Sequence, residues 1–162
     1  MARAPWYKGQ RGEWYVVVQF VLFALIGFGA RLFPQPSWTE PFALVARFLG
    51  FALMAAGAVL AFWGLAALGA NNLTALPYPR ETASLVMSGP YAIVRNPIYS
   101  GLILGSFGWG LWRESWPTLL FAAALFVLFD LKTRREQAWL EERFPEYREY
   151  CRRVKKLIPW LY

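Results

Sequence analysis

Residues 88–101 read Ser-Gly-Pro-Tyr-Ala-Ile-Val-Arg-Asn-Pro-Ile-Tyr-Ser-Gly, a polar stretch that leads directly into an apolar run. Pro97 lacks a backbone N–H and fits the first turn of a helix, whereas the residue before a proline is biased away from helical geometry. We therefore expect a helix to begin at Pro97. Its positive end would face the turn of residues 89–96, so that Arg95 and the helix start together form a site for an anion.

Two features of this stretch have ordinary structural interpretations as well. Four glycines leave room along the helix for a neighbouring helix or for a flat ligand. Arg95 could equally be an interfacial anchor to lipid phosphate. The glycines are Gly101, Gly105, Gly108 and Gly110.

The composition is that of a membrane protein. Hydrophobic residues make up 57% of the chain and aromatic residues 19%, while charged residues make up only 17%. A soluble domain would carry about 25% charged residues. With 162 residues, the chain is expected to form a single domain.

Cysteine and histidine content restricts the possible chemistry. The sequence has no histidine and one cysteine, Cys151. An intrachain disulfide and a Ser-His or Cys-His nucleophilic pair are therefore excluded, and we expect no metal site. A general base would have to be Asp, Glu, Tyr, Lys or water.

Four apolar runs predict an all-α fold, an integral membrane bundle of about four transmembrane helices in one domain of residues 1–162. The first two runs are long enough to cross the hydrocarbon core, and the last two predict a tight helical hairpin with Pro117 in the first turn of its second helix. The first run could also be a signal peptide. It lacks a small-residue cleavage site at Phe33-Pro34-Gln35-Pro36, so we expect a retained helix. The runs are residues 14–33, 42–68, 97–112 and 116–131.

Residues 132–162 are predicted to form a cytoplasmic helical tail. Apolar residues recur there at helical spacing, and Pro145 predicts a break near Phe144 with a second helix after it. The tail could lie on the membrane surface as an amphipathic helix, or it could cover a site at the cytoplasmic ends of the membrane helices. The stripe consists of Leu140, Phe144, Tyr147, Cys151, Val154 and Ile158.

The net charge of +7 is concentrated at the two ends. Arg3, Lys8 and Arg11 precede the first apolar run, and residues 132–162 hold nine Lys or Arg against five Glu. Positive-inside counting predicts that both termini and the 69–95 loop are cytoplasmic, in a bacterial-style inner membrane or alternatively a eukaryotic reticulum membrane. The expected partner is the lipid bilayer rather than nucleic acid. The oligomeric state is left open.

A second polar cluster, residues 130–137, follows the fourth run. The topology brings it to the same membrane face as Arg95. Within it, Glu136 could meet a cationic ligand group, or could pair with Lys132 or Arg135 in solvent.

Two motifs resemble the superfamily of isoprenylcysteine carboxyl methyltransferases and phospholipid methyltransferases. Residues Gly89–Gly101 resemble its signature G-P-Y-x-x-x-R-H-P-x-Y-x-G. The tail resembles its second pattern, E-E-x-x-L-x-x-x-F-x-x-Y-x-x-Y-x-x-x-V, and Leu68-Gly69-x-Asn71 also resembles the family. Together the resemblance covers roughly residues 65–162. The tail positions are Glu136, Gln137, Leu140, Phe144, Tyr147, Tyr150 and Val154.

The resemblance implies a membrane enzyme that uses S-adenosylmethionine and releases S-adenosylhomocysteine. The acceptor would be lipophilic, a lipid amine, a prenyl-type carboxylate or a thiol that enters from the bilayer. Arg95 suits the carboxylate of the methionine end, Glu136 suits its ammonium, and a tyrosine could stack on adenine or face the sulfonium. The implied catalytic residues are Asn96 and Tyr99. The implied cofactor-binding residues are Tyr91, Arg95, Asn96, Pro97, Tyr99, Gly101, Glu136, Gln137 and Tyr150.

Two positions depart from the family pattern: Asn96 stands for its usual histidine, and Gln137 for its second glutamate. Asparagine forms hydrogen bonds but does not take a proton near neutral pH. It suits a position that only binds cofactor; if the position instead had to deprotonate the acceptor, the acceptor here should already be nucleophilic. Two other functions are also consistent with the sequence. One is a non-catalytic lipid-binding membrane scaffold, and the other is a membrane reductase similar to sterol reductases.

Overall fold

The computed structural model describes residues 12–69, 72 and 84–162. The basic residues Arg3, Lys8 and Arg11, and Asn71 of the family pattern, lie outside the described residues. Within them the fold is all-helical, as predicted, and an isolated bridge pairs Val94 with Lys155. The helices are α1 (Glu13–Leu32), α2 (Phe42–Leu68), the 3-10 helix η2 (Gly89–Ala92), α3 (Pro97–Trp112), α4 (Trp116–Arg143) and α5 (Tyr147–Arg153).

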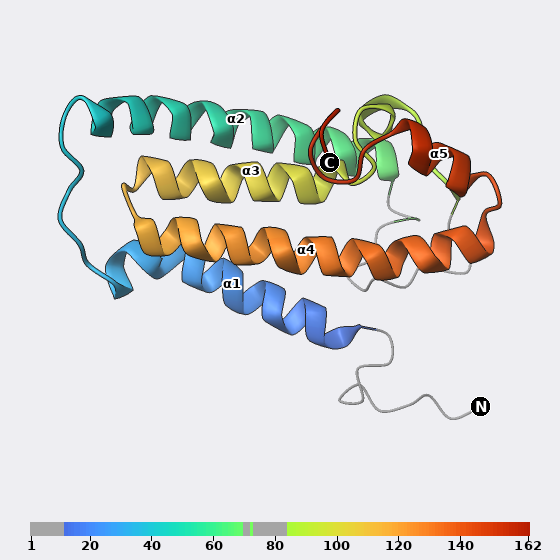
Figure 1. Ribbon diagram of the computed structural model, residues 1–162, viewed down its shortest axis with the longest axis horizontal. Coiled ribbons are helices and arrows are strands. Elements are labelled where there is room, and N and C mark those ends of the chain that lie inside the picture. Colours follow the sequence, from blue (N-terminus) through green and yellow to red (C-terminus); the bar gives the residue numbers. More distant parts are fainter. Residues whose placement is uncertain (1–11, 70–71, 73–83) are drawn as a thin grey trace.

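The long helices lie side by side (Figure 1). Helix α2 packs along α3, α3 packs against α4, and α1 packs against α4. The end of α2, the start of α3, the end of α4 and helix α5 gather at one end of the bundle. We call this end, which holds residues 89–101 and 147–162, the tail end.

The helix bounds follow the apolar runs closely, except at the end of α4 and in the last nine residues of the chain. Helix α4 continues without interruption to Arg143, so the prediction of a helix ending at residue 131 is wrong. The break predicted near Phe144 is confirmed, because α5 begins only at Tyr147. The predicted helical tail is helical only as far as Arg153, and residues 154–162 follow a non-helical path.

Helix α2 buries only its smallest side chains. Its buried residues are alanines and glycines, whereas Phe48, Phe51 and Phe62 are about 70% exposed. Small residues let helix backbones approach closely, and large apolar side chains on the outer face suit contact with lipid tails. This inverted distribution is expected of a membrane helix.

Among the described helices, α1, α2 and α4 are long and apolar enough to cross a membrane. Helix α3 is apolar but shorter. With 16 residues it is about 24 Å long, less than the roughly 30 Å of a hydrocarbon core. The three long helices indicate a bilayer environment, and a fourth crossing by α3 stays a prediction.

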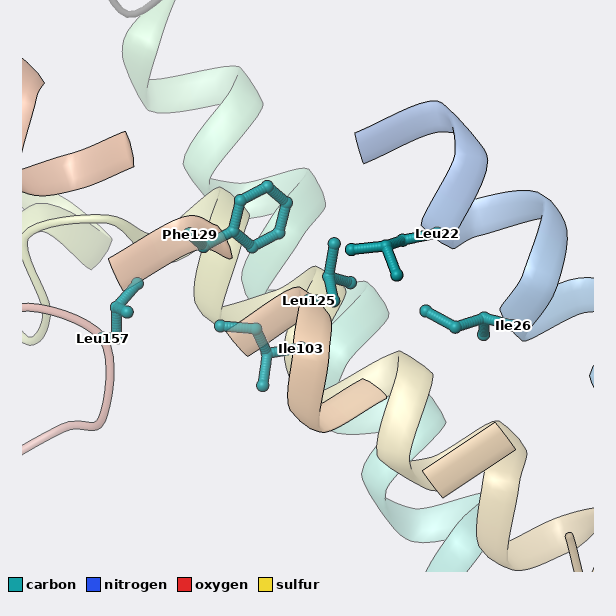
Figure 2. Packing of buried hydrophobic residues seen from close by; sticks show 6 residues of the cluster. All are labelled: Leu22, Ile26, Ile103, Leu125, Phe129 and Leu157. Carbon is teal, nitrogen blue, oxygen red and sulfur yellow. The ribbon is translucent and has the colours of Figure 1, made fainter. Parts of the chain in front are cut away.

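One apolar cluster connects α1, α3 and α4 beside the tail end (Figure 2). Leu22 and Ile26 of α1 point toward Leu125 of α4, and Phe129 lies further along α4. Leu157 of the C-terminal segment belongs to the same cluster and is 2% exposed. The C-terminal segment is therefore part of the packed core.

At the opposite end, Glu114 joins three segments. Its carboxylate accepts a hydrogen bond from the backbone N–H of Trp38 at 2.9 Å and pairs with Arg47 at 2.6 Å. Glu114 lies in the turn between α3 and α4, and Arg47 lies near the start of α2. This contact holds the α3–α4 turn against α2 and the 33–41 connection.

Candidate active site

The start of α3 has the local structure that its sequence predicts. Gly89 has a φ of +61°, in the left-handed region that favours glycine. The 3-10 helix of Gly89–Ala92 follows, and Asn96 is the N-cap residue before Pro97. The helix start predicted at Pro97 is confirmed. Residues 89–96 form a compact turn in front of it.

The tail packs directly on this turn through paired tyrosines. Tyr150 of α5 donates a buried hydrogen bond to the carbonyl of Tyr91 at 2.6 Å. Tyr91 is 8% exposed, and its hydroxyl lies 3.4 Å from the carbonyl oxygen of Gly64 in α2. Burial, reinforced by the negative charge of Glu136, raises the pKa of Tyr91 to about 12, so the phenol stays protonated at neutral pH.

The segment after α5 runs along the residues before α3. The backbone N–H of Arg95 donates to the carbonyl of Lys155 at 2.8 Å, and the Asn96 amide Nδ2 donates to the carbonyl of Lys156 at 3.0 Å. Val94 and Lys155 form the isolated parallel bridge. Residues 154–157, which we call the strap, are thus held to the turn through their backbone.

Arg95 directs its guanidinium toward the end of α4 and toward α5. One terminal nitrogen donates to Gln137 Oε1 at 3.1 Å and to Cys151 Sγ at 2.6 Å. The Arg95 Nε–H is buried and has no hydrogen-bond partner among the residues that the structure describes. A buried donor without a partner is costly, so this atom fits an acceptor such as a ligand carboxylate.

Glu136 lies beside a tyrosine of α3. Tyr99 donates its hydroxyl to Glu136 Oε1 at 2.7 Å. The Tyr99 ring stacks on Phe129 with centroids 4.5 Å apart, and the Lys132 ammonium lies 4.9 Å from the ring centroid. Glu136 is half-buried, and the charge of the buried Lys132 ammonium attracts its carboxylate.

Two residues predicted to bind cofactor, Gly101 and Pro97, lie at the contact between α3 and α2. Gly101 faces α2, where a Cβ would come within 2.8 Å of Ala61 Cβ. Pro97 is buried, and its ring would lie 3.0 Å from a Cβ added at Gly64. The other predicted residues gather around the turn, the end of α4 and α5. They are Tyr91, Arg95, Asn96, Tyr99, Glu136, Gln137 and Tyr150.

Two contacts at this end were not predicted as parts of the site. Cys151 accepts from Arg95, and burial raises the pKa of its thiol while the nearby Arg95 charge acts in the opposite direction. Lys132 donates to Gln19 of α1 at 3.1 Å. A polar Gln19 inside an otherwise apolar run was the available sequence signal, since such residues in membrane helices face other helices.

These helices and their polar tail end define a small integral-membrane helical protein with a polar site at one end of its bundle. The chain belongs to the phospholipid methyltransferase family, whose sequence profile matches residues 45–147. The resemblance noted in the sequence is therefore confirmed, and the family is one of phospholipid methyltransferases. The matched region includes η2, α3 and α4 and leaves out α1 and the strap.

Two curated relatives are similar over 151 residues, or 93% of this chain. The cobalt-zinc-cadmium resistance protein CzcN of Cupriavidus metallidurans is 34% identical, and the match covers 63% of its length. The nickel-cobalt-cadmium resistance protein NccN of Alcaligenes xylosoxydans xylosoxydans is 30% identical, with 64% of its length covered. The chain therefore spans less than two thirds of the length of these relatives.

Proposed function

We propose that this protein transfers a methyl group from S-adenosylmethionine to a lipophilic acceptor taken from the bilayer. Methyltransferases of its family generally use this cofactor. The observation that carries the proposal is the buried Nε–H of Arg95, beside the turn that starts α3. Within residues 12–69, 72 and 84–162 it has no hydrogen-bond partner. Glu136 adds a carboxylate at the same end of the bundle.

The two charged groups suit the two ends of an amino acid. Arg95 would bind the carboxylate of the methionine portion through its free Nε–H, with its terminal nitrogen already held by Gln137 and Cys151. Glu136 would bind the ammonium, and Tyr99 would orient that carboxylate through its hydroxyl. When bound, the cofactor supplies an electrophilic methyl group. The task of these residues is to align it and to exclude water.

Asn96 has a binding role in this proposal. Its amide donates to the Lys156 carbonyl and therefore holds the strap against the turn. An amide does not accept a proton near neutral pH, so on this proposal Asn96 is not a base, and the acceptor arrives already nucleophilic, as a carboxylate, a thiolate or a free amine.

The membrane arrangement completes the proposal. We propose that α3 is a fourth crossing, that the tail end faces the cytoplasm, and that α5 and the strap cover the site from that side in an inner membrane. A lipophilic acceptor would then enter sideways between the helices. The names of the two relatives refer to metal resistance. If this chain has a similar role, our proposal implies that it works by methylating a component of the membrane.

Binding of cofactor by detergent-purified protein tests the proposal. We expect calorimetry to detect S-adenosylhomocysteine binding by the wild type, and we expect Arg95→Ala to weaken it strongly. Arg148→Ala is a matched control, because Arg148 is 75% exposed and makes only a 3.7 Å contact with Glu141. Absence of binding by folded wild-type protein would overturn the proposal.

The acceptor is sought with labelled S-adenosylmethionine and a mixed lipid extract, followed by mass spectrometry of labelled products. A labelled lipid that depends on Arg95 supports methyl transfer. Binding without turnover on any extract would favour the lipid-binding scaffold. Binding of a nicotinamide cofactor would instead favour a reductase.

A further inference from the structure

We propose that Lys132 is a positioning residue that holds Tyr99 against Glu136, and that Gln19 of α1 in turn holds Lys132. This inference rests on the proposed function, because it concerns the carboxylate assigned to the cofactor ammonium. It extends the site to a helix that lies outside the family match, which begins at residue 45.

The burial of Lys132 is the first observation. The residue is 1% exposed, and its ammonium lies 6.0 Å from the ring centroid of Phe129, which is completely buried in the cluster of Figure 2. An ammonium in such surroundings is costly unless hydrogen bonds and charges compensate it. Its position is therefore determined by its partners. One of them is Gln19, whose Oε1 accepts from Lys132 Nζ at 3.1 Å.

The second observation is the position of the ammonium relative to Tyr99. Lys132 Nζ lies 4.9 Å from the Tyr99 ring centroid, within the range of a cation–π attraction. The same ring stacks on Phe129 at 4.5 Å with an interplanar angle of 18°. Together the two contacts set the plane of the ring, and in that plane the hydroxyl reaches Glu136 at 2.7 Å.

The helical register of α4 explains why these groups meet. Lys132 and Glu136 are four residues apart and so lie on one face of α4, one turn apart. Tyr99 comes from α3 and contacts both of them. A cation contacts its ring, and a carboxylate accepts from its hydroxyl. Loss of the cation would free the ring to turn and would move the hydroxyl away from Glu136.

Helix α1 enters the site through Gln19. It packs on α4, and Leu22, one turn further along α1, points toward Leu125 in Figure 2. That packing brings the Gln19 amide to the ammonium. We therefore expect α1 to influence cofactor binding although the family profile does not include it.

Fluorine NMR of protein labelled with 3-fluorotyrosine tests this arrangement without any cofactor. Tyr99→Phe assigns the Tyr99 signal. We expect Lys132→Met and Gln19→Leu each to shift that signal, and Lys132→Arg to restore it in part. Lys155→Met is the control, because Lys155 is exposed, and it should leave the signal in place. An unmoved Tyr99 signal in Gln19→Leu, or in a folded Lys132→Met, would overturn the proposal.

Calorimetry with S-adenosylhomocysteine on the same variants gives the second readout. We expect about tenfold weaker binding for Lys132→Met and Gln19→Leu, a factor typical of couplings between contacting residues. If the Tyr99 signal shifts but the affinity for S-adenosylhomocysteine stays the same, Lys132 only supports the local structure. That result would contradict its positioning role in cofactor binding. If the wild type binds no cofactor but the Tyr99 signal still shifts in the variants, the proposed function is contradicted. The contact between Lys132 and Tyr99 is then still supported.

Discussion

Gly57 of α2 and Gly101 of α3 face each other across a close contact between the two helix backbones. A Cβ added to Gly57 would lie 2.5 Å from the carbonyl oxygen of Gly101, and a Cβ added to Gly101 would lie 2.4 Å from the carbonyl oxygen of Gly57. Gly50 and Gly108 repeat the relationship further along, each at 2.6 Å. Backbone atoms cannot yield as a flexible side chain can, so these glycines set the separation of α2 and α3.

The first prediction concerns this contact. Gly57→Leu should lower the free energy of unfolding by about 1–3 kcal/mol or more, because the side chain must push the helices apart. Gly105→Ala is the control within α3, since its added Cβ meets nothing within 4 Å. Thermal unfolding in detergent compares the two. Equal losses in the free energy of unfolding for the two variants would contradict a close contact of α2 and α3 at Gly57.

The second prediction concerns the pH dependence of stability at the end opposite the tail. The Trp38 N–H and then Arg47 lower the pKa of Glu114 below its ordinary value of 4.5. The folded state therefore favours the charged carboxylate. This stabilisation is complete above pH 4.5 and is lost as the pH falls through the lowered folded pKa.

Glu114→Gln should accordingly be less stable than the wild type at neutral pH, with the difference shrinking on acidification to about pH 3. Glu40→Gln is the control, because its contact with Arg47 is longer, 3.5 Å, and both side chains are well exposed. Melting temperatures measured across the pH range provide the check. A difference that grows on acidification would refute the interpretation.

The third prediction concerns the strap. Asn96→Asp keeps the side-chain shape but replaces the amide donor with an acceptor that faces the Lys156 carbonyl. We expect faster hydrogen exchange at the Arg95 amide, which donates to Lys155. Asn96→His retains a donor and should preserve more of the protection. Unchanged exchange in the Asp variant would show that the amide does not hold the strap.

The fourth prediction concerns Cys151, the only cysteine of the chain. Burial raises the pKa of its thiol above the ordinary value of 9.0, and Arg95 partly offsets this. The midpoint of the pH dependence of alkylation should therefore lie above 9.0 in the folded protein and move higher still in Arg95→Gln. The unfolded protein provides the reference. A folded midpoint below that of the unfolded chain would contradict the burial argument.

Most of the fold was predictable from local sequence. Apolar runs and prolines located α2 and α3 without error and α1 to within one residue at each end, because helix length and helix start depend on nearby residues. The end of α4 was not predictable in this way. Its second half is polar, and nothing between Leu131 and Arg143 interrupts the helix, so the change of composition was mistaken for its end.

The candidate site, like the fold, has features that the sequence predicts and features that it does not. Sequence by itself determined the all-helical membrane class, the helix start at Pro97, and which polar residues are available, since each depends on residue type and spacing. Tertiary structure alone decided that Gly101 faces α2, that Tyr99 donates to Glu136, and that Gln19 of α1 reaches Lys132. These pairs are separated by tens of residues in the chain. Only the packing of whole helices, governed by the glycines between α2 and α3 and the apolar cluster between α1 and α4, brings them together.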